Sequence, residues 1–228
     1  MKNLCIIPAR GGSKRIPGKN LKLFLGQPIL LRVLEAARSA GLFDEIIVST
    51  DSEEIATMAI KGGAAVPFMR SDENASDTAS TVSVITETLG ELKKKNISPL
   101  NACCLYPTSV FASSDRIIEG YNLLASGHFD TVLAIQPYSH PIQRAFSFKD
   151  GKAEMLWPEN MFARTQDLAP RYHDAGQFYW MNSARFLETK QLFTANSGAV
   201  IFTEEECQDI DNPLDWEAAE SKYKKLHP

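Results

Sequence analysis

Residues 4–20 read LCIIPARGGSKRIPGKN, and this stretch decides the fold class. Its first four residues form a short, continuous apolar run that stops at Pro8, before a loop rich in Gly, Lys and Arg. Such a run is typical of a central strand in a parallel sheet, because helices cover both faces of that strand. We therefore predict a buried strand that leads directly into a basic, glycine-rich loop.

Strands and amphipathic helices then alternate as far as residue 136. The predicted helices cover residues 28–40, 81–95 and 113–126, and a further helix starts at 51–54. The predicted strands cover residues 45–49, 102–105 and 131–136, with a short strand or turn at 64–66 and a polar loop at 70–80. This order predicts an α/β protein with a doubly wound, mostly parallel, Rossmann-like sheet, whose ligands bind at the carboxyl ends of the strands.

The pattern changes over residues 137–172, where four prolines, several isolated aromatic residues and a hairpin-like turn at 149–152 interrupt the alternation. This composition predicts an inserted β-ribbon or arm. A helix at 183–189, a strand at 198–202 and a helix at 213–224 follow it. The organisation we expect is one domain over residues 1–228 that carries residues 137–180 as an inserted, β-rich arm.

Composition narrows the class of protein. Hydrophobic residues make up 44% of the chain and charged residues 23%, proportions that are ordinary for a globular enzyme. The formal net charge of -4 argues against duplex nucleic acid as a partner, since binding to a phosphate backbone favours a basic surface. No apolar run approaches the length of a membrane span, and the four cysteines include no CxxC pair. We expect a cytoplasmic protein with no nucleic-acid or membrane partner.

The basic loop is the first candidate ligand site. Its three glycines let the backbone approach a ligand closely, and its basic side chains are suited to neutralising phosphate charges. These side chains are Arg10, Lys14, Arg15 and Lys19. The loop is not a Walker A motif, because Ser13 stands where the first Gly belongs and Asn20 where Ser or Thr binds magnesium. A GxGxxG fingerprint is also missing, which excludes a dinucleotide-dependent oxidoreductase. The alternative is a solvated basic loop without a ligand.

Asp209 and Asp211 are the second candidate site. Residues i and i+2 of an extended segment point the same way, so both carboxylates are able to reach one hard cation. Two surface acids near the start of a helix are the alternative interpretation.

Five ordered motifs resemble the CMP-sialic acid synthetase (acylneuraminate cytidylyltransferase) family, over essentially the whole chain. They are IPARGGSKRIPGKN at 7–20, STD at 49–51, Arg70 followed by DTAS at 77–80, LYPTS at 105–109, and CQDID at 207–211 followed by DW at 215–216. The family usually carries Gln where Tyr106 stands. Within it, residues 164–180 (RTQDLAPRYHDAGQFYW) are most similar to the pseudaminic acid cytidylyltransferases. The resemblance implies a nucleotidyltransferase fold.

The resemblance also implies a reaction, in which a hydroxyl of a nine-carbon 2-keto sugar acid attacks the α-phosphate of CTP and pyrophosphate leaves. It assigns a magnesium ion to Asp209 and Asp211, and catalytic roles to Arg10, Lys19 and Asp211. The CTP-binding candidates are Ala9, Arg10, Gly11, Ser13, Lys14, Lys19, Asn20, Arg70 and Ser80. The sugar-binding candidates are Tyr106, Gln136, His173, Asp174 and Gln177. The arm is expected to serve sugar binding and the formation of a homodimer.

Alternatives remain at four of these positions. Arg70 could form a surface ion pair, Ser80 could cap the following helix, Tyr106 could be a core residue, and His173 could be a hydrogen-bonded loop residue. The sugar is also open. Departures from the sialic acid pattern at 165, 173, 175 and 177 favour pseudaminic acid, with N-acetylneuraminic and legionaminic acid as alternatives. A non-enzymatic nucleotide-binding subunit is the alternative from another class.

Overall fold

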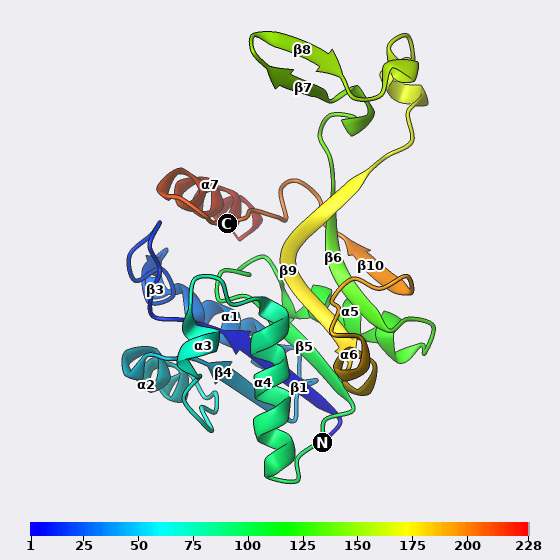
Figure 1. The fold of residues 1–228 in the computed structure, drawn as a ribbon. Coiled ribbons are helices and arrows are strands. Elements are labelled where there is room, and N and C mark those ends of the chain that lie inside the picture. Colours follow the sequence, from blue (N-terminus) through cyan, green and yellow to red (C-terminus); the bar gives the residue numbers. More distant parts are fainter. Residues whose placement is uncertain (228) are drawn as a thin grey trace.

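The computed structural model describes residues 1–227, which fold around one mixed sheet of six strands in the order β10-β6-β9-β5-β1-β4 (Figure 1). The strands are β1 (Asn3–Pro8), β4 (Glu45–Ser49), β5 (Asn101–Leu105), β6 (Thr131–Pro137), β9 (Tyr172–Asn182) and β10 (Ser197–Ile201). The helices are α1 (Ile29–Ser39), α2 (Glu53–Lys61), α3 (Asp72–Ala75), α4 (Thr81–Lys94), α5 (Ser114–Ala125), α6 (Ser183–Thr189) and α7 (Pro213–Leu226).

The sheet is parallel except at one strand. β1 pairs in parallel with β4 and β5, and β10 pairs in parallel with β6. β9 runs antiparallel between β5 and β6 and joins these two parallel groups. The predicted doubly wound, mostly parallel sheet is confirmed. At 64–66, where a short strand or turn was predicted, the structure has a single parallel bridge between Ala65 and Ile47.

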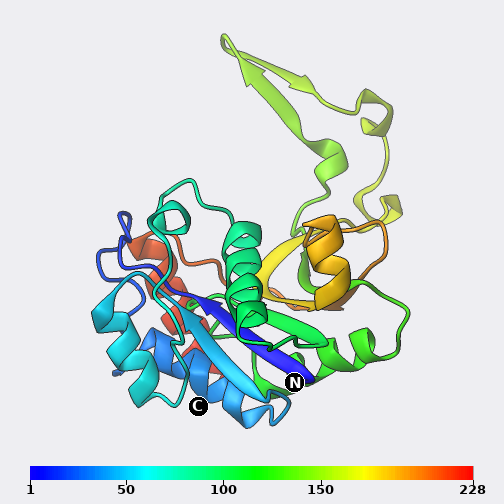
Figure 2. The same cartoon turned by 60° about the horizontal axis from the view of Figure 1, so that its bottom comes forward.

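Side chains alternate between the two faces of the sheet and thereby build two cores. In β1, Cys5 and Ile7 belong to a cluster that contains buried residues of α1, α2, α5 and α7. Leu4 and Ile6 belong to a second cluster, with buried residues of α4 and α6. Helices therefore cover both faces, and the continuous apolar runs in the sequence are explained by this three-layer arrangement (Figures 1 and 2).

The arm leaves the sheet after β6 and returns through β9 (Figures 1 and 2). It carries the hairpin of β7 (Phe146–Lys149) and β8 (Lys152–Met155) and three 3-10 turns, at Ile142–Arg144, Pro158–Asn160 and Thr165–Asp167. The stretch expected to be arm, 137–180, is longer than the segment that projects. Residues from Tyr172 onward pair with β6, and from Phe178 onward they also pair with β5. The sequence boundary differs because β9 pairs with strands distant in sequence.

Two short elements were not expected from the sequence. A small hairpin of β2 (Leu23–Phe24) and β3 (Gln27–Pro28) precedes α1. Helix α3 lies inside the predicted polar loop, where the Ser71 side chain accepts a hydrogen bond from the Asn74 N–H at 3.4 Å. Within residues 1–227, none of the helices combines the length and the apolar character needed to cross a membrane.

Candidate active site

The basic loop starts where the carboxyl ends of β1 and β4 meet. The N–H of Ala9, which is fully buried, donates to the carbonyl of Ser49 at 2.9 Å. The N–H of Gly11 then donates to Asp51 Oδ1 at 2.8 Å. Because β1 and β4 are parallel, these bonds fix the loop at the edge of the sheet where α/β proteins bind ligands.

The rest of the loop closes on itself. Ile16 is 3% exposed and packs into the core, which leaves its polar neighbours on the outside. The Asn20 carboxamide, itself buried, donates from Nδ2 to the Arg10 carbonyl at 2.9 Å. Gly18 has a φ of +62°, the left-handed region in which glycine carries no steric cost. Asn20 therefore supports the shape of the loop, while the basic side chains face outward.

The outward-facing basic side chains meet carboxylates of other segments. Arg10 Nη1 lies 2.7 Å from Asp77 Oδ1, and Lys14 Nζ forms an ion pair with Asp77 Oδ2. Arg15 Nη1 lies 2.7 Å from Asp211 Oδ2. Asp77 comes from the segment between α3 and α4, and its two cationic neighbours lower the pKa of its carboxyl group. The cationic cluster is thus neutralised by carboxylates of the chain itself.

Lys19 joins the loop to the segment that carries the two aspartates. Its Nζ donates to the carbonyl of Ile210, between Asp209 and Asp211, at 2.7 Å. Burial lowers the pKa of Lys19, and the charges of Asp211 and Asp209 oppose that shift. Partial desolvation raises the pKa of Asp209, and the neighbouring charge of Asp211 raises it further. The two carboxylates are close enough for their charges to repel each other.

These groups surround one cavity of about 250 Å³. Its lining residues are Pro8, Arg10, Ser13, Lys14, Arg15, Ile16, Lys19, Asn20, Tyr106, Pro107, Thr108, Asp209 and Asp211. The structure therefore brings the phosphate-loop candidates, the aspartate pair and one sugar candidate together, although they are up to about 200 residues apart in the sequence.

Arg70 and Ser80 are CTP candidates that lie outside this lining. Arg70 is 6% exposed, so the surface ion pair is wrong. Its Nε donates to Ser49 Oγ at 3.0 Å and its Nη2 to the Ser49 carbonyl, and burial lowers its pKa. Ser80 is exposed, and its Oγ accepts from the Ser83 N–H at 3.0 Å, so the helix cap is confirmed. Arg70 lies behind the loop at the end of β4, and Ser80 at the start of α4.

Four of the five sugar candidates lie at the base of the arm or beside it. The Tyr106 hydroxyl is hydrogen-bonded to Thr81 Oγ1 at 2.8 Å, and burial raises the pKa of Tyr106 to about 12. Gln136 and His173 are register partners in β6 and β9. His173 Nδ1 donates to the Asp174 carbonyl at 2.9 Å, which matches the hydrogen-bonded alternative. Of these candidates, Tyr106 is the one that lines the same cavity as the basic loop.

Gln177 is placed differently from its expected position. It is 2% exposed, and its Nε2 donates to the Ala175 carbonyl at 3.1 Å and approaches Cys207 Sγ at 3.9 Å. It therefore lies behind the segment that leads to Asp209, and it is not part of the cavity lining. The cause is a bulge at Gly176, whose φ of +62° rotates the strand between Asp174 and Gln177.

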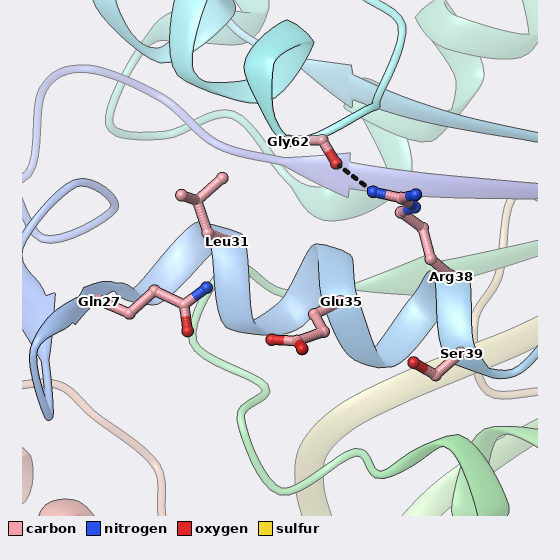
Figure 3. A pocket seen from close by; sticks show the side chains of 6 residues that line it. All are labelled: Gln27, Leu31, Glu35, Arg38, Ser39 and Gly62. Atoms are coloured by element: carbon pink, nitrogen blue, oxygen red, sulfur yellow. Dashed lines mark hydrogen bonds between the residues drawn. The ribbon is translucent and has the colours of Figure 1, made fainter.

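A second cavity, of about 530 Å³, lies along the outer side of α1 (Figure 3). Gln27, Leu31, Glu35, Arg38, Ser39 and Gly62 line it. Arg38 donates to the Gly62 carbonyl at 3.2 Å and closes one end. Despite its larger volume, this cavity contains none of the candidate residues, and it lies on the helix layer away from the strand ends.

A family model for cytidylyltransferases matches residues 4–195, a span that includes the basic loop and every strand of the sheet before β10. The chain belongs to the cytidylyltransferase family. It is 38% identical to a pseudaminic acid cytidylyltransferase of Campylobacter jejuni over 100% of this chain and 98% of that protein. It is 31% identical to a CMP-N,N'-diacetyllegionaminic acid synthase of Legionella pneumophila over 96% of this chain and 95% of that protein.

Solved structures agree with the cytidylyltransferase fold. A CMP:2-keto-3-deoxy-manno-octonic acid synthetase complexed with CTP matches 99% of this chain and 100% of that chain, with a TM-score of 0.73 and 16% identity. A 4-diphosphocytidyl-2C-methyl-D-erythritol synthase from Anaerococcus prevotii covers 98% of both chains, with a TM-score of 0.67 and 13% identity. The predicted nucleotidyltransferase fold is confirmed.

Several residues of this cytidylyltransferase site were not among the sequence candidates. Asp51 and Asp77 belong to the STD and DTAS motifs, so the sequence indicated that both positions matter. It did not indicate their partners, which are Gly11 and Arg10. Thr81 lies outside these motifs, and Tyr179 lies within residues 164–180, but helix and strand periodicity accounts for both positions. They support the site through hydrogen bonds that only the packing of α4 and β9 on β5 creates.

Proposed function

We propose that this enzyme couples CTP to pseudaminic acid and releases pyrophosphate. The identity of 38% to pseudaminic acid cytidylyltransferases over the full chain supports the choice of sugar. The observation that carries the reaction is the joint cavity, in which the cations of the basic loop and the pair Asp209 and Asp211 face one space at the strand ends. CTP is a cytoplasmic nucleotide, and we place the enzyme in that compartment, as a homodimer.

The proposed reaction needs positioning and charge neutralisation more than a covalent intermediate. Arg10 and Lys14 are placed to bind phosphate oxygens once these replace the Asp77 carboxylate. Lys19 holds the Asp209–Asp211 segment against the loop and adds a positive charge beside it. Tyr106 lines the same cavity and would separate the phosphates from a sugar bound toward the base of the arm. Protein groups on both sides of the α-phosphate would thus fix the attacking hydroxyl and the leaving pyrophosphate.

A divalent cation, which we propose to be Mg²⁺, fits the donor set. Mg²⁺ in nucleotide sites is bound through one or two carboxylates, water and the phosphates of the substrate. Asp209 and Asp211 supply two such carboxylates, and both line the same cavity as the basic loop. When bound, the ion would neutralise charge on the phosphates. Arg15, paired with Asp211 in this structure, would then be free to contact the nucleotide.

The test is pyrophosphate release from CTP, UTP or ATP combined with pseudaminic, legionaminic or N-acetylneuraminic acid. We expect CTP with pseudaminic acid to be the best pair, and activity to disappear when EDTA removes divalent ions and to return with Mg²⁺. Reactions without sugar control for CTP hydrolysis. An enzyme that binds CTP but transfers to none of the sugars would support the non-enzymatic alternative and overturn this proposal.

The selectivity for the sugar is measured as the ratio of the kcat/KM values for pseudaminic acid and N-acetylneuraminic acid. Tyr106, Thr165 and His173 replace a carboxamide and two guanidinium groups that sialic acid synthetases usually carry, so fewer donors face a polyhydroxylated tail. Unpaired polar groups discriminate strongly between substrates. We expect N-acetylneuraminic acid to be at least about tenfold poorer than pseudaminic acid, roughly 1.4 kcal/mol in the transition state. Tyr106→Gln should narrow this gap by lowering kcat/KM for pseudaminic acid. Equal values in the wild type would reject the choice of sugar but not the transfer reaction.

A further inference from the structure

A chain of contacts leads from the cavity to an exposed carboxylate at the base of the arm. Tyr106, in the cavity wall, packs edge to face on Tyr179, with ring centroids 5.6 Å apart. The Tyr179 side chain is almost fully buried, and its hydroxyl donates to Asp174 Oδ2 at 2.5 Å. Asp174 itself is exposed at the start of β9. A buried hydroxyl therefore holds a carboxylate that faces solvent.

Both oxygens of this carboxylate are held by the protein. The Gly176 N–H donates to Asp174 Oδ1 at 2.9 Å, while Tyr179 occupies Oδ2. An ionised carboxylate has about four acceptor sites, so each oxygen keeps capacity for a donor from the solvent side. The group accepts hydrogen bonds and donates none. A ligand recognised by Asp174 must therefore present N–H or O–H groups at this place.

The charges at the two ends of the site also favour one orientation of an acidic ligand. Four basic side chains and two carboxylates, Asp209 and Asp211, line the loop end of the cavity, so the sum of these charges is positive. Asp174, by contrast, is bonded to Tyr179, which packs on Tyr106. A sugar acid has a carboxylate that the loop attracts and Asp174 repels. Pseudaminic acid also carries two acylamino groups, and each has an N–H that a carboxylate accepts. The acid end should therefore lie toward the basic loop and an acylamino group toward Asp174.

We propose that Asp174 binds an acylamino N–H of the sugar and that Tyr179 is a positioning residue that holds Asp174 for this contact. This inference rests on the proposed function. It assigns part of the sugar selectivity to a buried side chain, because the Tyr179 hydroxyl would act on the sugar through Asp174.

The first test is Tyr179→Phe, which removes the hydroxyl and keeps the ring. The ring contacts with Tyr106 and Phe193 are therefore retained. We expect the KM for pseudaminic acid to rise about tenfold, while kcat and the KM for CTP stay within about twofold. Tyr223→Phe is the matched control, since this tyrosine packs on Phe24 and Phe111 in the other core and should change neither KM. Thermal unfolding verifies that each variant is folded.

The second test is a double-mutant cycle with Asp174→Asn. Asn keeps one acceptor oxygen but turns the other position into a donor, so the single variant should also raise the sugar KM about tenfold. If Tyr179 acts only through Asp174, the double variant should be no worse than Asp174→Asn alone. Three outcomes would overturn the inference: additive effects of the two substitutions, an unchanged sugar KM in Tyr179→Phe, or an equal loss in kcat and in CTP binding. In each case the proposed function would still stand if the wild type is active on pseudaminic acid. A wild type inactive on pseudaminic acid would instead reject the proposed function, and this inference with it.

Discussion

Each basic side chain of the loop after β1 has a partner inside the protein. Arg10 and Lys14 pair with Asp77, Arg15 pairs with Asp211, and Lys19 donates to the carbonyl of Ile210. Under the proposed function, a triphosphate entering the cavity would replace these carboxylates around the same cations. Asp77 would then compete with the nucleotide, because it pairs with Arg10 and Lys14, two of the proposed phosphate ligands.

Asp77→Asn removes this competing charge and keeps the size of the side chain. We expect the KM for CTP to fall about two- to fivefold, a small effect because exposed ion pairs are weak. The difference should shrink in high salt, which screens the charges. Asp72→Asn, an exposed acid on α3, is the control. A higher KM for CTP in Asp77→Asn would show instead that Asp77 holds Arg10 and Lys14 in the orientation that CTP needs.

Asp211→Ala should keep the fold and abolish most turnover. The proposed cation loses one carboxylate ligand, and loss of one such electrostatic contact in a transition state costs about 10²–10³-fold in rate. Asp209→Ala should behave in the same way or somewhat more mildly. Glu217→Ala, at an exposed acid on α7, controls for the loss of one negative charge. Near wild-type rates for both aspartate variants at low Mg²⁺ would contradict the metal assignment.

At the scale of elements, the contact between α5 and β9 fixes the position of the antiparallel strand. Gly120 of α5 packs directly on β9, where a Cβ atom would lie 2.7 Å from Phe178 Cε2 and 2.9 Å from Trp180 Cδ1. Both aromatic side chains are fully buried, and the Trp180 Nε1 donates to the Ile117 carbonyl at 3.0 Å. Neither ring is able to move without disturbing this core.

Gly120→Ala should therefore destabilise the protein even though alanine favours helices. The helix propensity gain is about 1 kcal/mol, whereas overpacking of a rigid core costs about 1–3 kcal/mol. Gly90→Ala in α4 is the matched control, because nothing lies within 4 Å of its Cβ position, and it should stabilise the protein by up to about 1 kcal/mol. Urea unfolding measures both changes. An equal gain in both variants would show that β9 yields to the added methyl group.

At the scale of the molecule, the arm carries apolar surface far from the core (Figure 1). Phe148 is 76% exposed and Phe162 is 93% exposed, and Phe146, Leu156 and Met161 are exposed beside them. Clustered apolar side chains on a projecting ribbon are typical of a surface that another chain covers. We expect this surface to form the contact between two copies of the chain.

Light scattering at micromolar concentration should accordingly give the mass of a homodimer. Phe148→Ser combined with Phe162→Ser should shift the mass toward the monomer, because both remove apolar area from the arm. Leu214→Ser is the control, since Leu214 is 74% exposed on α7, outside the arm. A monomeric wild type would refute the dimer, and an unchanged dimer in the double variant would place its interface elsewhere.

The sequence by itself determined the elements that depend on neighbouring residues. The apolar run before Pro8, the helical spacing in α1 and α4, and the basic loop are local patterns, so their place in the α/β order was predictable. The two-residue spacing of Asp209 and Asp211 also predicted a shared cavity position, because an extended backbone points both side chains the same way.

Only the tertiary structure decided which distant residues meet. β9 lies antiparallel between β5 and β6, although its sequence continues from the arm, because strand pairing depends on partners far along the chain. The bulge at Gly176 buries Gln177 and leaves Asp174 exposed, a rotation that strict alternation does not predict. Asp77 reaches Arg10 across 67 residues, and Tyr179 reaches Asp174 only after that bulge. The basic loop was therefore predictable from the sequence, whereas its ion-pair partners and the arrangement of the proposed sugar-binding residues depended on long-range packing.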